Sequence, residues 1–211
     1  MNLTRRAQDS LKQRLPYDAL LPDRMPFYVS SLVYSFGALT LGAFAMLILS
    51  GVTMVANGPL WWQRSAIGYY VHDVHYWSAQ AFFFFLVLHL TSQFFMGSWR
   101  HGRALTWMVG AFTFGLAVLE AFLGYLSRGD FFAQWNQTQG KAAFNALGLG
   151  SWLNLLNNGQ VYGLHISVIP AVLVLLVGTH LFLVRSRGLA PPYPPDEAEL
   201  RAAGPAGGSD A

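Results

Sequence analysis

The stretches HYWSAQAFFFFLVLH (residues 75–89) and HISVIPAVLVLLVGTH (residues 165–180) decide the fold, because each is an apolar run that begins and ends on a histidine. The histidines are 14 and 15 residues apart, which corresponds to about 21 to 22 Å along a helix. Both spacings are close to a whole number of helical turns, so each pair lies on nearly one helix face. Each helix therefore offers one imidazole toward each side of a roughly 30 Å hydrocarbon layer.

The composition is that of a membrane protein. Of the 211 residues, 54% are hydrophobic and only 11% are charged, whereas soluble domains carry about 25% charged residues. Four apolar segments reach the about 20 helical residues that cross a bilayer: residues 27–56, 75–96, 105–126 and 162–184. The sequence therefore predicts an all-α membrane protein, a bundle of four transmembrane helices.

The remaining parts of the chain are expected at the membrane surface. The connection 127–161 is too long for a simple turn and is rich in aromatic and apolar residues, so we expect interfacial helices there. Residues 1–26 are predicted to form a cytoplasmic amphipathic arm, since they lack the apolar core and cleavage site of a signal peptide. Residues 27–188 form the predicted four-helix domain, and the Pro-, Gly- and Ala-rich residues 189–211 a flexible tail.

Positive charges set the expected orientation in the membrane. Ten of the thirteen lysines and arginines fall in the N-terminal arm, in the turn between the second and third segments, or after the fourth. Such residues stay on the cytoplasmic side, so both termini are expected on the negative side of a bacterial inner membrane or its equivalent. No basic run is interleaved with aromatic residues as nucleic-acid binding requires, and we expect no nucleic-acid partner.

Two histidine pairs carry the predicted chemistry. One helix intervenes between the second and fourth segments, so these run parallel and bring His75 level with His165, and His89 level with His180. Two axial imidazoles saturate a haem iron, whereas zinc usually takes three or four protein ligands. The chain contains no cysteine, which excludes C-x-x-C-H haem attachment. The alternative is four polar residues hydrogen-bonded inside a bundle, but two matching pairs at equal depth favour two haem sites.

The glycines repeat the histidine period. Gly37 and Gly51 in the first segment, and Gly110 and Gly124 in the third, are also 14 residues apart. Glycine permits close approach to a backbone, so we expect Gly51 and Gly124 to flank the outer haem and Gly37 and Gly110 the inner one. Ordinary packing of small residues between helices explains any one of these glycines but does not predict the shared period.

Three further ionisable residues remain open. Glu120 lies deep in the third segment, about one turn before Gly124. We weigh a catalytic role, as a proton or quinone contact near the outer haem, against a carboxylic acid satisfied by a neighbouring helix. His72 is expected to face the interface, although it could bind a haem propionate, and His101 is expected to be solvated.

At these residues the chain resembles the cytochrome b/b6 family over nearly its whole length, in its short four-helix form. The histidine spacings, the run GSWRHGRALTWMVG (97–110) and the run VYGLHISVIP (161–170) carry the resemblance. It implies the cytochrome b subunit of a quinol:cytochrome c (bc/b6f-like) oxidoreductase, with two non-covalent haem b groups and quinone. It also implies a homodimeric complex with a subunit-IV-like membrane chain, a Rieske iron-sulfur protein and a cytochrome c-type subunit, so that this chain alone is not a complete enzyme.

The chain departs from the family pattern mainly on its outer side. Three positions at which the family usually carries arginine near the haems hold Tyr76, Ser92 and Gln160. The Pro-Trp pair that usually follows the Gly-Tyr at 124–125 is also missing, as is the Pro-Glu-Trp-Tyr segment of the outer quinol site. These departures keep two alternatives open: a di-haem anchor that links another dehydrogenase or reductase to the quinone pool, and a non-redox transporter bundle.

On the inner side more of the family pattern is retained. Arg185, five residues after His180, is expected to bind an inner haem propionate as an arginine-carboxylate pair. Arg100, in the basic turn, is expected to contact the inner cofactors as well. Ser35 stands where chloroplast-type relatives carry a cysteine that holds an extra haem, so no covalent haem is expected.

Overall fold

The computed structural model describes residues 31–191, and four long helical segments dominate them. These segments are α3 (Leu32–Asn57), α5 (Ala66–Phe95), α6 (Ala104–Leu126) and a continuous run of α8 (Asn158–Gly163), η2 (Leu164–Val168) and α9 (Ile169–Arg187). Each of the four is long and apolar enough to cross a membrane, which confirms the predicted all-α bundle. The predicted arm at 1–26 and the tail from residue 192 onward lie outside the described residues.

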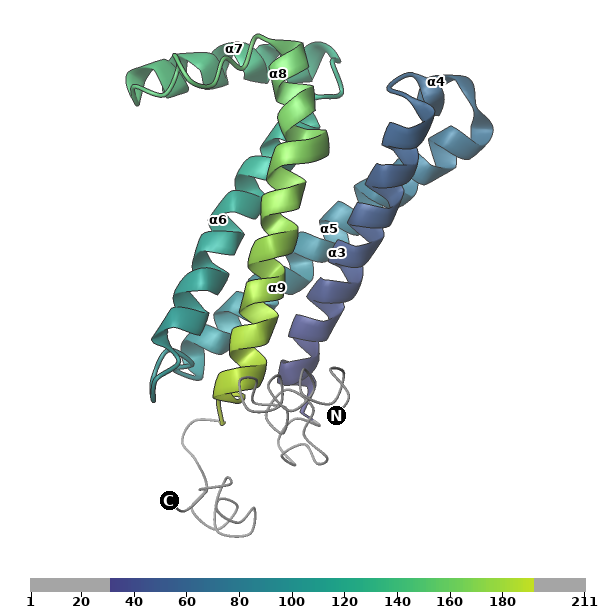
Figure 1. Ribbon diagram of the computed structural model, residues 1–211. Helices are drawn as coiled ribbons and strands as arrows, with labels where there is room; N and C mark the ends of the chain where they lie inside the picture. The colour runs from purple at the N-terminus through teal and green to yellow at the C-terminus, as the bar shows by residue number, and fades with distance from the viewer. Residues whose placement is uncertain (1–30, 192–211) are drawn as a thin grey trace, which may run out of the picture.

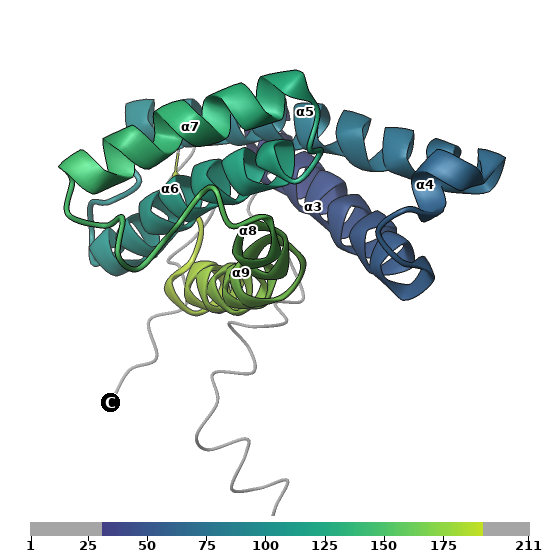
Figure 2. The same cartoon turned by 90° about the horizontal axis from the view of Figure 1, so that it is seen from above.

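The helices form two packed pairs, α3 with α5 and α6 with α9, and contacts between the pairs are sparse. At one end of the bundle lie α4 (Trp61–Arg64) and α7 (Phe131–Ala146), and we call it the loop end (Figure 1). At the opposite end, the terminal end, α3 begins and α9 ends. Seen from above, α6 lies next to α9, and α3 lies next to α5 (Figure 2).

The connection between α6 and α8 contains one helix that lies across the loop end of α6 (Figure 1). Asp130 caps this helix, α7, by accepting a 2.8 Å hydrogen bond from the Ala133 N–H, and Arg128 pairs with Asp130 at 2.7 Å. The apolar residues 147–157 form turns rather than a second helix. One interfacial helix is thus present in the predicted connection.

The second long helix begins nine residues earlier than the hydropathy pattern indicates. Ser65 caps it by accepting a hydrogen bond from the Gly68 N–H. The polar residues His72 and Asp73 lower the local hydropathy without breaking the helix. His75 therefore lies in the third turn of α5 rather than at its edge.

The apolar core lies where the two pairs meet, and most other apolar side chains face outward. Phe82 of α5, Ala117 of α6 and Leu173 of α9 are buried together, and the ring of Phe44 from α3 lies 5.8 Å from that of Phe82. Side chains such as Leu175 remain largely exposed, as a lipid-facing surface requires. The paired histidine rings lie between the two helix pairs, one set on the loop-end side of this small core and the other on its terminal-end side.

Candidate functional site

The two histidine pairs face each other across the space between the helix pairs. The ring centres of His75 and His165 are 6.3 Å apart with an interplanar angle of 80°, and those of His89 and His180 are 6.5 Å apart at 88°. An imidazole-metal bond of about 2 Å, together with a roughly 1 Å distance from nitrogen to ring centre, puts two rings on opposite sides of one metal ion about 6 Å apart. Both separations match that span.

Hydrogen bonds fix the tautomer of two of these rings. The Ser50 hydroxyl donates to the Met46 carbonyl at 2.6 Å, so it accepts from Nδ1 of His75 at 2.9 Å. The Thr106 carbonyl can only accept, and it lies 3.1 Å from Nδ1 of His180. With the proton on Nδ1, Nε2 of each ring keeps a free lone pair for a metal.

His165 has a different partner, the carboxylate of Glu120. Oε1 of Glu120 lies 2.7 Å from Nδ1 of His165. The contact is a close electrostatic one, because Nδ1 is not aligned for a regular hydrogen bond. Nδ1 of His89 is buried and has no partner among the described residues. The structure therefore brings together Glu120 and His165, which the sequence places 45 residues apart.

Each of the four periodic glycines lies against one of the four rings. A Cβ atom built on Gly51 would be 3.3 Å from Cε1 of His75, and one on Gly37 would be 3.2 Å from Cε1 of His89. On α6 the approach is closer: 2.9 Å from Gly110 to His180 and 2.6 Å from Gly124 to His165. A distance under 3.0 Å leaves no room for a side chain. The glycines thus clear space around every ring.

A π-helical turn explains why the two histidine spacings differ by one residue. His165 lies in η2, where the Ile169 N–H donates to the carbonyl of Leu164, five residues earlier. Pro170 follows directly and has no N–H for the carbonyl of Ile166, which favours the wider turn. The π turn contains one extra residue. His165 and His180, which are 15 residues apart, therefore lie on one helix face, as His75 and His89 do on α5 with a spacing of 14. The sequence pattern alone did not reveal this turn.

The donor set fits iron porphyrin better than a bare metal ion. Within residues 31–191 no group of three or more His, Cys, Asp or Glu side chains is arranged to hold a metal ion, so each pair offers only two ligands. Buried polar atoms without partners also lie at the start of α6, where the Thr106 carbonyl contacts His180: Nε of Arg103, Oγ1 of Thr106 and Nε1 of Trp107. Such atoms suit the carboxylate groups at the edge of a haem.

The three positions at which the related pattern has arginine serve other purposes here. Tyr76 is 46% exposed, and the Ser92 hydroxyl donates to the His89 carbonyl. Gln160 holds the loop before α8 through two hydrogen bonds: its side chain accepts from the Asn154 N–H and donates to the Trp152 carbonyl. None of them places a cation beside the histidine pairs.

The predicted inner arginines lie at the terminal end but on its surface. Arg100 and Arg185 are both exposed, while Arg187 donates to the Gly102 carbonyl at 2.7 Å and joins α9 to the turn before α6. Arg103, half-buried at the start of α6, has a guanidinium nitrogen, Nε, that is buried without a hydrogen-bond partner. Sequence reasoning therefore found the basic turn and gave less weight to its most enclosed member.

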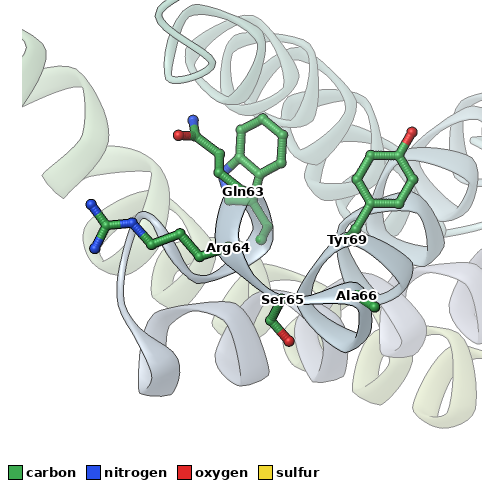
Figure 3. A pocket seen from close by; sticks show the side chains of 6 residues that line it. Gln63, Arg64, Ser65, Ala66 and Tyr69 are labelled. Carbon is green, nitrogen blue, oxygen red and sulfur yellow. The ribbon is translucent and has the colours of Figure 1, made fainter.

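A separate hollow of about 530 Å³ lies at the corner between α4 and α5 (Figure 3). Trp62, Gln63, Arg64, Ser65, Ala66 and Tyr69 line it. None of the paired histidines is among them. His72 stacks on Trp62 nearby, with ring centres 4.3 Å apart, so this histidine has its own ring partner and is not a member of either pair.

Ser50 and Thr106 are the functional candidates that sequence reasoning missed. Ser50 directly precedes Gly51, and Thr106 lies four residues before Gly110, as Glu120 does before Gly124. Thr106 and Glu120 are thus also 14 residues apart on α6 and contact the two histidines of the last helix. A polar residue directly before a periodic glycine is the signal that could have found Ser50, whereas Thr106 acts through its backbone carbonyl, which no side-chain pattern reveals.

Comparisons with known proteins agree with this architecture. Residues 80–204 match the family described as cytochrome b(N-terminal)/b6/petB, a range that starts after His75 and contains the other three paired histidines. A cytochrome b6 of Heliomicrobium gestii is 23% identical over 80% of this chain and 89% of that protein. The menaquinol:cytochrome c reductase cytochrome b subunit of Bacillus subtilis is 27% identical over 78% of this chain and 84% of that protein.

The fold also has a solved counterpart. A chain of a hyperthermophilic respiratory Complex III superimposes with a TM-score of 0.65 at 20% identity, over 94% of this chain and 62% of that chain. This chain thus spans less than two thirds of the solved one. Because the family match covers more than half of the sequence, including the second half of α5 and the whole of α6, α8 and α9, the chain belongs to the cytochrome b(N-terminal)/b6/petB family.

Proposed function

We propose that the chain carries electrons across a membrane through two haem b groups, as the cytochrome b subunit of a quinol:cytochrome c oxidoreductase. The observation that carries the proposal is the pair of histidine ring separations, 6.3 and 6.5 Å, each of which matches the span across one iron. His75 with His165 would hold one haem, and His89 with His180 the other. Bound haem would supply reversible one-electron storage, and two imidazole ligands from this chain would leave no position open for oxygen.

The protein's own residues hold the ligands in place and clear the space around them. Ser50 and the Thr106 carbonyl keep the Nδ1 proton on His75 and His180, which directs Nε2 toward the metal. Gly37, Gly51, Gly110 and Gly124 leave room for a flat ring beside the imidazoles. The two sites lie about 21 Å apart along the helices, so one is near each membrane surface.

The proposed orientation puts the loop end on the outer, positive side. Among the described residues, the loop end has three cationic side chains, and two of them are engaged: Arg128 with Asp130 and Lys141 with Asn154. The terminal end has more, namely Arg100, Arg103, Arg185 and Arg187, as the cytoplasmic side requires. This end would also provide the firmer quinone contact, since cations and hydrogen-bond donors gather there.

A second function is favoured by the loop end itself. Tyr76 and Gln160 supply no cation where the family pattern has arginine, and Gln160 is committed to the loop before α8. A di-haem anchor that passes electrons between a dehydrogenase and quinone, without quinol oxidation at the loop end, would need no such cation. Partner proteins therefore decide between the two functions.

The test is to purify the tagged chain from its native membranes and identify its partners. We expect reduced-minus-oxidised bands of haem b, a co-purifying Rieske iron-sulfur protein and subunit-IV-like chain, and reduction of cytochrome c by quinol. A coloured complex with a dehydrogenase and no Rieske protein would select the anchor. A colourless protein would contradict both functions and favour the transporter bundle.

A further inference from the structure

Glu120 is an acid at a depth where acids are rare. It and Asp73 are the two acidic residues of the four described spanning helices, and Asp73 lies near the start of α5 with its side chain 45% exposed. The Glu120 side chain is only 14% exposed, and its Oε2 is buried without a hydrogen-bond partner. A buried carboxylate is costly unless a specific partner compensates for it.

That partner is His165, at 2.7 Å between Oε1 and Nδ1. If a protonated carboxyl group donated a hydrogen bond to Nδ1, Nδ1 would be the acceptor, the imidazole hydrogen would be on Nε2, and Nε2 of His165 could not bind a metal. The ligand role thus requires that the ring hydrogen is on Nδ1, the nitrogen that lies next to Oε1 of Glu120. Glu120 and Gly124 are one turn apart on α6 and lie on the same helix face. This face therefore provides both the carboxylate next to Nδ1 of His165 and the room for the His165 ring.

The four histidines differ in the group that faces Nδ1. His75 faces a serine hydroxyl and His180 a backbone carbonyl, both neutral, and Nδ1 of His89 has no partner among the described residues. Of the four paired histidines, only His165 has a charged group next to its Nδ1. A carboxylate makes the imidazole a stronger electron donor to its metal, and its negative charge favours the more positive oxidised iron.

We infer that Glu120 is a positioning residue that acts on His165 through the close contact of its carboxylate with Nδ1 and lowers the reduction potential of the loop-end haem. The inference rests on the proposed function, since it needs haem at the His75–His165 pair. It assigns Glu120 to the ligand rather than to quinone or to proton delivery. The asymmetry between the two sites then has a structural cause in one side chain.

The test is a redox titration of the intact complex that carries Glu120→Gln, with the haem absorbance bands as readout. The amide keeps the size and the acceptor oxygen but removes the charge. We expect both haems to remain and the loop-end haem to become easier to reduce by about ten-fold in its equilibrium constant, or about 59 mV for one electron. The other haem should keep its potential.

Two matched variants separate charge from contact. Ser50→Ala removes the neutral partner of His75 on the same haem and should produce a smaller shift than Glu120→Gln. Asp73→Asn removes an exposed acid from the loop end of α5 and should leave both potentials unchanged, because solvent screens its charge. The His89→Leu variant, which we expect to keep the loop-end haem alone, assigns the shifted band.

An unchanged loop-end potential in Glu120→Gln, with both haems bound, would overturn the inference. So would slower quinol oxidation at unchanged potentials, which would instead assign Glu120 to quinone. If Glu120→Gln loses the loop-end haem while Gly115→Val keeps it, the holding role stands and Glu120→Asp should restore binding. A wild-type protein without haem would contradict the proposed function itself, which is a distinguishable result.

Discussion

Replacing His89 with leucine is expected to remove one of two haem b groups from each chain and to spare the other. The leucine side chain fills a similar volume but offers no lone pair, and His180 alone cannot complete a six-coordinate iron. His75→Leu should have the converse effect on the loop-end haem. The haem absorbance per chain should fall by about half in either variant, measured on protein purified in detergent.

The matched control is His72→Leu, on the same helix as both ligands. The ring of His72 stacks on that of Trp62, with ring centres 4.3 Å apart, and is not one of the four paired rings, so both haems should remain. Loss of a haem in His72→Leu would mean that this histidine binds the cofactor after all. Two intact haems in His89→Leu would contradict the proposed pairing.

Gly124→Val should empty or distort the loop-end haem site. A Cβ atom at this position would lie 2.6 Å from Cε1 and 3.0 Å from Nε2 of His165, so the imidazole must move away from its ligand position. An overpacked side chain costs about 1–3 kcal/mol, which corresponds to an about 5- to 150-fold weaker haem affinity. Haem content and the low-spin electron paramagnetic resonance signal measure the effect.

Gly115→Val provides the control on the same helix. A Cβ at Gly115 meets nothing within 4 Å, so this variant has the same change in helix propensity without the clash. It should bind two haems with unchanged spectra. If Gly124→Val and Gly115→Val behave alike, whether both are normal or both are impaired, clearance around His165 is not the reason for the glycine.

The four-helix fold could be predicted because lipid demands long apolar helices and little else matches that composition. Helix ends were harder to predict. Hydropathy placed the start of the second helix at residue 75, but His72 and Asp73 lie within α5, which Ser65 caps at its first turn. A polar side chain near the membrane surface can stay solvated in a helix, so hydropathy marks the bilayer rather than the helix.

The histidine and glycine positions could be predicted because both follow from one geometric period. The group that faces Nδ1 of each ring could not be predicted, because it depends on how α3 packs against α5 and how α6 packs against α9. Ser50 looks like an ordinary polar residue in an apolar helix until its contact is known, and the group that faces His180 is the backbone carbonyl of Thr106, which every residue type has. The π turn at His165 was also invisible, because the 15-residue spacing is itself close to four turns of a regular helix.

The number and ligation of haems per chain test the central claim most directly. Haem extracted from the purified wild-type protein should equal two haem b per chain, and electron paramagnetic resonance should show two low-spin ferric signals that are typical of bis-imidazole ligation. The two signals should disappear separately in His75→Leu and His89→Leu. A single haem per chain, or a high-spin signal with an open axial position in the intact wild-type protein, would contradict the account.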